Sequence, residues 1–271
     1  MLQRHCAVGP LRIGGGAPVR LMGVINASPE SFYRGSYTPV GGIYDRVLAM
    51  QGAGADMIDI GARSTAPGSV PITVAEEVER VDAVLSELDG TGAILSVDTR
   101  HPEVLDICLR HDVHAVNDIS GLADERYARA VADSGLPVFV MASFHEPGDA
   151  AGLAGTFAAL ETVVARCARL GIDEYVLDPA IGRWTPERTN EDDWELCRNF
   201  ETFLTFGRPV LAAVSRKTFI GDLLGREPEG RLAGTLALTM DLVRQGAAVV
   251  RSHDVAETAD LLQVHEKMRK I

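Results

Sequence analysis

The chain has 271 residues, of which 46% are hydrophobic and 24% are charged, and its formal net charge is −12. This composition is typical of a globular protein, and the acidic balance argues against nucleic-acid binding, which needs clustered Lys and Arg. The apolar runs are too short to span a bilayer, so we also expect no membrane association. No charged segment followed by an apolar one opens the sequence, which predicts a cytoplasmic location.

The cysteines lie far apart and lack the Cys-x-x-Cys spacing of a zinc or redox site. Most of them fall in helical patterns, where a side chain packs against the core. We therefore expect buried or half-buried free thiols rather than disulfides. The four cysteines are Cys6, Cys108, Cys167 and Cys197.

Short apolar runs alternate with amphipathic helical patterns along the chain. The runs are nearly continuous in apolar residues, which is typical of strands covered on both faces. The expected strands are residues 20–26, 56–62, 93–99, 115–119, 137–143, 175–180, 209–215 and 248–254. The helical patterns lie at residues 44–54, 73–88, 101–111, 124–134, 156–170, 190–205, 229–245 and 255–269.

Eight strand–helix units in succession predict a (β/α)8 barrel, the TIM barrel. An open doubly wound sheet is the main alternative, and it would need a phosphate loop such as Gly-x-Gly-x-x-Gly after the first strand. The Gly-rich segment 12–18 precedes that strand instead, and we interpret it as the turn of an N-terminal hairpin, residues 1–19, that closes the barrel floor. No linker or repeat divides the sequence, so residues 1–271 are expected to form a single domain.

Polar side chains end most of the predicted strands. In a barrel of this type the active site lies at the carboxyl ends of the strands, so these groups should point at a substrate. Any one of them could instead cap the next helix, which is how we interpret Asp254, and Asp118 is ambiguous in the same way. Helix caps alone would not select a mixture of amides, carboxylates and cations. The candidate site residues are Asn26, Asp98, Asn117, Asp178, Ser215, Arg216, Lys217, Arg251 and His253.

One half of this set consists of acceptors and an amide, namely Asp98, Asn117 and Asp178. These groups match a flat heterocycle with adjacent N–H donors, because a buried carboxylate facing two parallel N–H groups forms charge-assisted hydrogen bonds. We therefore expect this half to hold a heterocyclic ring.

The other half lies on the first and last strands, which are neighbours in a closed barrel. It contains Asn26, Arg251 and His253, and the last two share one face of their strand because they are two residues apart. An amide, a guanidinium and an imidazole suit a phosphate or pyrophosphate, with Mg²⁺ as a further partner. Arg216 and Lys217 lie between the two halves.

With these residues in view, the sequence resembles the dihydropteroate synthases, within the wider family of pterin-binding barrels. The first loop of that family reads Asn-x-Thr-Pro-Asp-Ser-Phe, and residues 26–32 read Asn-Ala-Ser-Pro-Glu-Ser-Phe. The second loop reads Glu-Ser-Thr-Arg-Pro-Gly, and residues 63–68 read Arg-Ser-Thr-Ala-Pro-Gly. Five further motifs follow in the family's order: SVDT (96–99), VNDISG (116–121), DPAIG (178–182), SRKTFIG (215–221) and RSHDV (251–255). The resemblance covers essentially the whole chain from Met22 onward.

The resemblance implies condensation of 6-hydroxymethyl-dihydropterin pyrophosphate with an arylamine, such as p-aminobenzoate, and release of pyrophosphate. It implies that the pterin is bound by Asp98, Asn117, Asp178 and Lys217. It implies that Asn26, Arg251 and His253 hold the pyrophosphate and act with Lys217 in catalysis, with Asn26 as a ligand of Mg²⁺. Thr65, Pro67, Phe32 and Thr218 would form the arylamine side, and Ser215 and Arg216 would support Lys217. A homodimer through the last helices is also implied.

Departures from the family pattern fall mainly on the arylamine and leaving-group side. Ala66 stands where the family has an arginine, and Arg34 or Arg63 is a candidate replacement for the missing cation. The family's next motifs also change: residues 33–36 read Tyr-Arg-Gly-Ser for Ser-Asp-Gly-Gly, residues 141–143 lack a histidine, and residues 181–188 lack the family's Phe and Lys. These departures favour an unusual arylamine. The first loop resembles archaeal synthases associated with methanopterin, whose arylamine carries a ribosyl phosphate.

Two other functions stay open at this point. A pterin-binding methyltransferase acting with a corrinoid protein shares the Asp/Asn/Asp set, but it has no use for a pyrophosphate site. Asn26, Lys217 and the segment 251–254 therefore argue against it. A homologue that binds pterin and has lost synthase activity is compatible with Ala66 and the altered first loop.

Overall fold

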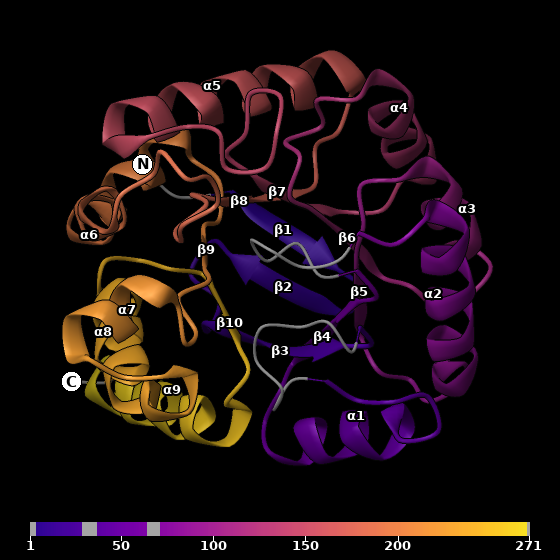
Figure 1. Ribbon diagram of the computed structural model, residues 1–271, viewed down its shortest axis with the longest axis horizontal. Coiled ribbons are helices and arrows are strands. Elements are labelled where there is room, and N and C mark those ends of the chain that lie inside the picture. Colours follow the sequence, from indigo (N-terminus) through magenta and orange to yellow (C-terminus); the bar gives the residue numbers. More distant parts are fainter. Residues whose placement is uncertain (1–3, 29–36, 64–70, 270–271) are drawn as a thin grey trace.

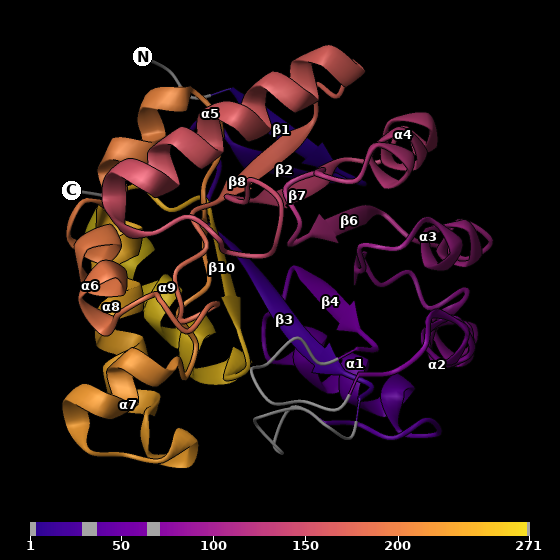
Figure 2. The ribbon, with the colours of Figure 1, turned by 45° about the horizontal axis from the view of Figure 1, so that its top comes forward.

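The computed structural model describes residues 4–28, 37–63 and 71–269. Eight parallel strands form a barrel that a ring of helices surrounds, which confirms the predicted (β/α)8 fold (Figures 1 and 2). The barrel strands are β3 (Arg20–Asn26), β4 (Met57–Gly61), β5 (Leu95–Asp98), β6 (Ala115–Asp118), β7 (Val138–Met141), β8 (Tyr175–Asp178), β9 (Leu211–Ala212) and β10 (Val249–Ser252).

The strands are hydrogen-bonded in the order β8-β7-β6-β5-β4-β3-β10-β9. The last strand therefore pairs with the first, as the sequence predicted, with Arg251 opposite Met22. A bridge between Leu177 and Val210 joins β8 to the segment before β9 and closes the barrel. All eight carboxyl ends consequently lie at one end of the barrel, and Asn26, Asp98 and Asp178 are the last residues of their strands there.

The helices follow the predicted alternation. They are α1 (Ile43–Gly52), α2 (Val74–Leu88), α3 (Pro102–Cys108), α4 (Glu125–Ser134), α5 (Gly152–Leu170), α6 (Asn190–Arg198), α7 (Thr218–Leu224), α8 (Leu232–Arg244) and α9 (Val255–Arg269). Helix α7 was not predicted, because its seven residues are too few to show a helical period. The expected helix 190–205 divides after Arg198 into α6 and the 3-10 helix η2 (Phe200–Phe206). A short 3-10 turn, η3 (Pro228–Gly230), precedes α8.

The N-terminal hairpin closes the floor of the barrel. Its strands are β1 (His5–Val8) and β2 (Leu11–Gly14), and Val8 pairs with Leu11. The turn is therefore Gly9-Pro10, with Gly9 at φ 51°, and the prediction that placed it within residues 12–18 was wrong. Hydrophobic side chains of the hairpin pack against the amino ends of the strands, in a cluster of Cys6, Val8, Ile13, Met22, Met57, Ala115, Phe139, Val176, Leu211, Ala248 and Val249.

The four cysteines are buried free thiols, as expected. Burial raises the pKa of the Cys108, Cys167 and Cys197 thiols to about 12, so each stays protonated and unreactive at neutral pH. Within the described part of the chain, none of the helices combines the length and apolar character that crossing a bilayer requires.

On the outer face, His111 joins helix α2 to the end of helix α3. Its Nδ1 lies 2.8 Å from Asp89 and its Nε2 lies 3.0 Å from Asp82. Burial alone would lower the pKa of His111, but the hydrogen bonds to Asp82 and Asp89 outweigh it, and the net pKa is raised above 6.5. The hydrogen bond from His111 also lowers the pKa of Asp89. The contact should therefore stabilise the fold most when the imidazole is charged and the carboxylates are ionised.

We expect His111→Gln to reduce the free energy of unfolding by about 0.5–1 kcal/mol near pH 5.5 and by less near pH 8.5. A histidine with a raised folded pKa contributes fully below its unfolded pKa, and the contribution disappears as pH rises through the folded value. Asp89, whose pKa is lowered in the folded protein, loses its contribution to stability only as the pH falls much further. Urea unfolding of both proteins at the two pH values measures this, and a difference independent of pH would contradict it.

Candidate active site

A buried carboxylate lies at the centre of the polar groups inside the barrel mouth. Asp59, in the middle of β4, is fully buried, and its Oδ2 accepts hydrogen bonds from Asn117 Nδ2 at 2.9 Å and from Arg251 Nε at 2.8 Å. Arg251 Nη2 lies 2.7 Å from the same oxygen and 3.7 Å from Asp98 Oδ2. A residue that the sequence analysis missed therefore joins two predicted residues, on β6 and β10, and Arg251 links this group to Asp98 on β5.

Asp59 does carry a sequence signal of its own. It is the charged residue in the segment Met-Ile-Asp-Ile-Gly, all of whose residues are buried. A charge at such a position is costly unless it is paired, so an Asp inside a strand covered on both faces indicates an interior partner. Its Oδ1 is buried and makes no hydrogen bond with the described residues. Asp59 Oδ1 therefore offers a hydrogen-bond acceptor among the polar side chains at the barrel mouth.

The neighbouring carboxyl group, that of Asp98, has a pKa close to neutral pH. Burial and the negative charge of Asp59 raise the pKa of Asp98 to about 7, and Arg251 opposes this effect. Its side chain remains 23% exposed at the mouth of the barrel. At neutral pH this carboxyl can therefore donate as well as accept a hydrogen bond, which suits a ring with both kinds of edge group.

Asp178 ends β8 and lies against a bent backbone. Ala180 has φ 57°, a left-handed conformation, and its N–H donates to Asp178 Oδ1 at 2.8 Å. Burial raises the pKa of Asp178, while the Ala180 N–H, Lys217 and Arg251 lower it. Backbone strain of this kind persists where the surroundings require it, and it often marks a functional site.

Lys217, immediately before α7, completes this side of the mouth. Burial lowers the pKa of its amine to about 8, despite the opposing charge of Asp178. The Nζ lies 4.9 Å from the centre of the Trp184 ring. It also fits against Gly182, where a Cβ would stand only 2.7 Å from Nζ and where φ is +134°. The missing side chain at Gly182 therefore provides the space for the amine.

The imidazole of His253 is neutral. Burial and then the charges of Arg251, Lys217, Arg216 and Arg46 lower the pKa of His253 to about 3. Its backbone N–H donates to the Ser215 hydroxyl at 3.1 Å, and its Nδ1 lies 2.9 Å from the same oxygen. Because the hydroxyl accepts from the backbone, its own proton is available for Nδ1. When the hydroxyl donates to Nδ1, the imidazole hydrogen is on Nε2.

Arg216 and Asp254 form part of the wall of the site. Nε and Nη2 of Arg216 donate to the two oxygens of Asp254 at 2.9 and 2.7 Å, in a bidentate ion pair. Nη1 of Arg216 donates to the carbonyls of Pro228 and Glu229. The carboxylate that we interpreted as a helix cap therefore holds the strand–helix segment that presents Lys217.

Asn26 ends β3 beside Gly61 of β4. Its Oδ1 lies 3.5 Å from the point that a Cβ on Gly61 would occupy, and Asp98 Oδ2 lies 3.9 Å from that point. The amide oxygen and the Asp98 carboxyl therefore both border Gly61 at the mouth of the barrel.

Two further residues from the sequence analysis have structural partners. Asp118 accepts hydrogen bonds from Ser120 N, Ser120 Oγ and Leu122 N at 2.8, 2.5 and 2.6 Å, so it fixes the turn after β6. Arg63 donates to Glu77 at 2.6 Å and to the carbonyl of Ile72, so its charge is balanced by Glu77. This pairing argues against Arg63 as the replacement for the arginine missing at Ala66.

The predicted arylamine side can be placed only in part. Thr218 is exposed at the first position of α7, next to Lys217. The other predicted residues, Phe32, Thr65 and Pro67, lie outside the described residues, as do Arg34 and Ala66.

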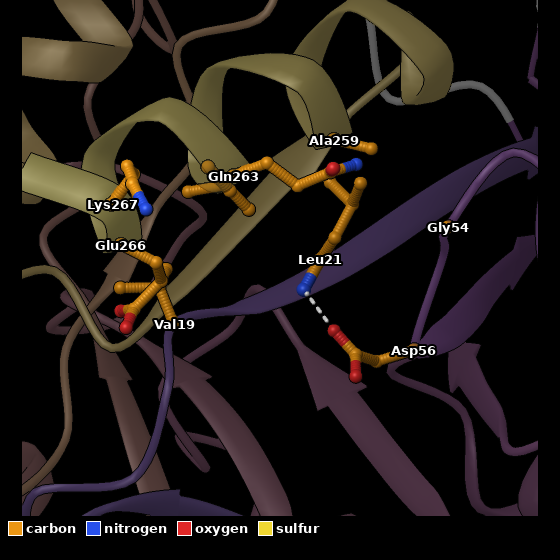
Figure 3. Close-up of a pocket in the computed structure, with 9 residues that line it drawn as sticks. Val19, Leu21, Gly54, Asp56, Ala259, Gln263, Glu266 and Lys267 are labelled. Carbon is orange, nitrogen blue, oxygen red and sulfur yellow. Dashed lines mark hydrogen bonds between the residues drawn. The ribbon is translucent and has the colours of Figure 1, made fainter.

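A groove of about 450 Å³ lies on the side of the barrel, between the start of β3 and α9 (Figure 3). Its walls include Val19, Leu21 and Ala259. One of its two acidic residues, Asp56, already accepts a hydrogen bond from Leu21 N at 2.8 Å and pairs with Arg20 at 2.9 Å, and the other is Glu266. This groove offers none of the convergent polar groups of the barrel mouth, so the mouth is the candidate active site.

Comparison with known proteins agrees with this geometry. Residues 22–253 match the family of pterin binding enzymes, and the chain belongs to that family. Its relatives there are dihydropteroate synthases, as the motifs indicated. The enzyme of Escherichia coli (strain K12) is 33% identical over 257 residues, which cover 91% of this chain and 90% of that protein.

Solved structures of the same kind superpose over nearly the whole chain. The dihydropteroate synthase of Xanthomonas albilineans with 4-aminobenzoic acid is 33% identical, with a TM-score of 0.87 over 99% of both chains. The same enzyme in complex with 7,8-dihydropteroate is 31% identical, with a TM-score of 0.85 over 99% of this chain and 100% of that one.

Proposed function

We propose that the protein is a dihydropteroate synthase that condenses 6-hydroxymethyl-dihydropterin pyrophosphate with an arylamine and releases pyrophosphate. The observation that carries this proposal is that Asn117 and Arg251 both bind the buried Asp59 at the barrel mouth, while Arg251 also lies 3.7 Å from Asp98. Relatives with 33% identity over nearly the whole chain are dihydropteroate synthases, and one solved relative contains 7,8-dihydropteroate. The same arrangement does not favour a corrinoid-linked methyltransferase, because that reaction has no pyrophosphate to bind.

The carboxylate-rich side of the mouth suits the pterin. Asp178 can accept paired N–H groups from the ring, and the charge-assisted bonds are strong because the carboxylate is buried. Asp98, with a pKa of about 7, can donate to or accept from the neighbouring edge of the ring. Lys217 contributes an ammonium next to Asp178, and Asn117 is oriented by its hydrogen bond to Asp59.

The cationic side suits the leaving group. Departure of pyrophosphate concentrates negative charge on its oxygens, and preorganised donors stabilise that charge in the transition state. Arg251 supplies a guanidinium that stays charged at all relevant pH values. His253 is neutral, with a pKa of about 3, so it supplies an N–H donor without adding charge repulsion to Arg251.

Mg²⁺ is part of this proposal. The described residues contain no group of three His, Cys, Asp or Glu side chains that could enclose a metal ion. Mg²⁺ normally uses one or two protein ligands together with substrate phosphates, so the amide oxygen of Asn26 beside Asp98 fits such an ion. When bound, the ion would neutralise charge on the departing pyrophosphate.

The second substrate, the assembly and the location are further parts of the proposal. The arylamine is p-aminobenzoate or a ribosylated aminobenzene, and the loss of an arginine at Ala66 favours a nucleophile without a free carboxylate. We propose a homodimer, as the family resemblance implies. The free buried cysteines support a reducing, cytoplasmic location.

Incubation with the pterin pyrophosphate, Mg²⁺ and a panel of arylamines tests the proposal. Pyrophosphate release that requires an arylamine supports a synthase. Tight pterin binding without release would instead identify a homologue that has lost the activity, and absence of pterin binding would contradict both.

We expect Gly182→Ala to weaken pterin binding by about 10-fold to 100-fold, because the new Cβ must displace the Lys217 amine from a position 2.7 Å away. Titration calorimetry with 6-hydroxymethyl-dihydropterin measures the affinity. Gly155→Ala, in helix α5, is the matched control: its Cβ would meet backbone atoms of Ala150 only at 3.8 Å. Equal affinities of the two variants would contradict the proposed role of the Gly182 space.

A further inference from the structure

A buried ion pair lies behind the lysine side of the mouth. Arg188, in the loop between β8 and α6, donates from Nε to Asp193 Oδ1 at 3.1 Å, and both side chains are 0% exposed. Arg188 Nη1 also donates to the carbonyl of Ala150 at 3.4 Å. This loop contains the positions at which residues 181–188 depart from the family pattern, so the pair belongs to a segment that the resemblance does not explain.

The Arg188–Asp193 ion pair is not an efficient way to stabilise the fold. Burying two charges costs several kcal/mol for each ion, and the cost is recovered only when the remaining polar atoms are also satisfied. Here Arg188 Nη2 and Asp193 Oδ2 are buried and make no hydrogen bonds with the described residues. An apolar pair of similar volume would often be as stable. The retained charges therefore point to a role other than holding α6 in place.

A short series of contacts leads from this ion pair to Lys217. Asp193 Oδ1, which accepts from Arg188, also accepts the backbone N–H of Gly182 at 2.8 Å. Gly182 in turn borders the Lys217 amine, since a Cβ there would stand 2.7 Å from Nζ. The position of the Gly182 peptide therefore sets the space that the amine occupies.

Trp184, two residues beyond Gly182, also lies near the amine. Its ring centre lies 4.9 Å from Lys217 Nζ, a cation–π distance. The ring stacks directly on Gly148, where a Cβ would stand 2.3 Å from the tryptophan side chain. The β8–α6 loop is thus fixed at Trp184 by packing and at Gly182 by the ion pair, and both residues lie near the lysine amine.

We propose that the buried Arg188–Asp193 ion pair is a positioning element for Lys217, which it places against Asp178 by fixing the Gly182 peptide. The effect of this ion pair on pterin binding rests on the proposed function. The placement of the amine itself does not depend on it.

The two partners act on the amine with opposite sign. Around Lys217, Asp178 of β8 and Asp193 of α6 raise its pKa, whereas Arg251 of β10 and Arg188 of the loop lower it, and burial lowers it most. Asp193→Asn keeps the shape and the hydrogen bond to Gly182 but removes a negative charge, so it should lower the pKa of Lys217. Arg188→Gln removes a positive charge and should raise it. An ion pair remote from Lys217 would produce no such opposed changes.

The sequence makes this measurement direct, because it contains only three lysines, Lys217, Lys267 and Lys270. Lysine labelled with ¹³C at Cε gives correspondingly few NMR signals, and Lys217→Arg assigns the one that titrates near pH 8. We expect this midpoint to fall in Asp193→Asn and to rise in Arg188→Gln. We also expect affinity for 6-hydroxymethyl-dihydropterin to fall about 10-fold in both variants.

An exposed ion pair on the same helix provides the matched control. Arg198 and Glu191 of α6 are paired and have side chains 57% and 73% exposed. Arg198→Gln and Glu191→Gln should change neither the Lys217 midpoint nor the pterin affinity. If Arg188→Gln fails to fold, Arg188→Lys, which keeps the charge, should restore folding and return the midpoint toward the wild-type value.

An unchanged Lys217 midpoint in folded Asp193→Asn and Arg188→Gln would overturn the proposal, and so would changes in the same direction. If the wild-type protein bound no pterin while the midpoints still moved in opposite directions, the proposed function would fail and the coupling of the ion pair to Lys217 would stand.

Discussion

Asp178→Ala should reduce the affinity for pterin by at least about 100-fold, effectively abolishing binding at micromolar concentrations. Removing one partner of a buried, charge-assisted hydrogen bond costs about 2–5 kcal/mol, because the ring N–H groups are left without acceptors. The loss also leaves Lys217 without the carboxylate that most raises its pKa. Titration calorimetry with 6-hydroxymethyl-dihydropterin measures the affinity directly.

The control for this prediction lies near the amino end of the same strand. Asp173 is exposed in the loop before β8, so Asp173→Ala makes the same chemical change away from the mouth. Asp178→Asn separates charge from shape, and it should fall between Ala and the wild type. Unchanged pterin affinity in a folded Asp178→Ala protein would remove the pterin pocket from this end of the barrel.

Asp59→Asn should lower kcat/KM by about 100-fold to 1,000-fold, although this residue lies below the strand ends. The carboxylate pairs with Arg251 at 2.7 Å and orients Asn117 at 2.9 Å, so its loss leaves the guanidinium with only the longer 3.7 Å contact to Asp98 and weakens the hold on the amide. Both the pterin side and the leaving-group side of the mouth are then disturbed. Steady-state kinetics with saturating arylamine measure the effect.

A double-mutant cycle with Arg251→Met tests whether the two residues act as a unit. We expect the double variant to be no worse than the poorer single variant, because the second change removes the charge whose nearest partner the first change neutralises. Asp56→Asn is the matched control, because Asp56 lies directly before the amino end of β4 and pairs with Arg20 there. Additive effects of Asp59 and Arg251 on kcat/KM would contradict a shared role.

The barrel was predictable from the sequence because apolar runs, which form the strands, alternate with segments that show the amphipathic period of a helix. Strand β3 was predicted to the residue, at 20–26, and helix α9 at 255–269. The missed helix and the misplaced hairpin turn lie in segments too short to show a recognisable sequence pattern. Helix α7 has seven residues, and the hairpin turn falls at Gly9-Pro10 and not among the later glycines.

The site was predictable only at the strand ends. A search for polar residues that terminate apolar runs found Asp98, Asn117 and Arg251, which do converge, but it passed over Asp59 inside its strand. Asp254 was assigned to a cap because its position before a helix suits that role, and its ion pair with Arg216 depends on a contact 38 residues away in sequence. Such partners follow from tertiary structure and leave no local pattern.

The most direct test of the account is a time course of pyrophosphate release from 6-hydroxymethyl-dihydropterin pyrophosphate in the presence of Mg²⁺, with and without arylamine. The barrel mouth predicts release only when an arylamine is present, one pyrophosphate for each pteroate-type product formed. Tight binding of the pterin pyrophosphate with no release, for p-aminobenzoate and for ribosylated aminobenzenes alike, would contradict a synthase.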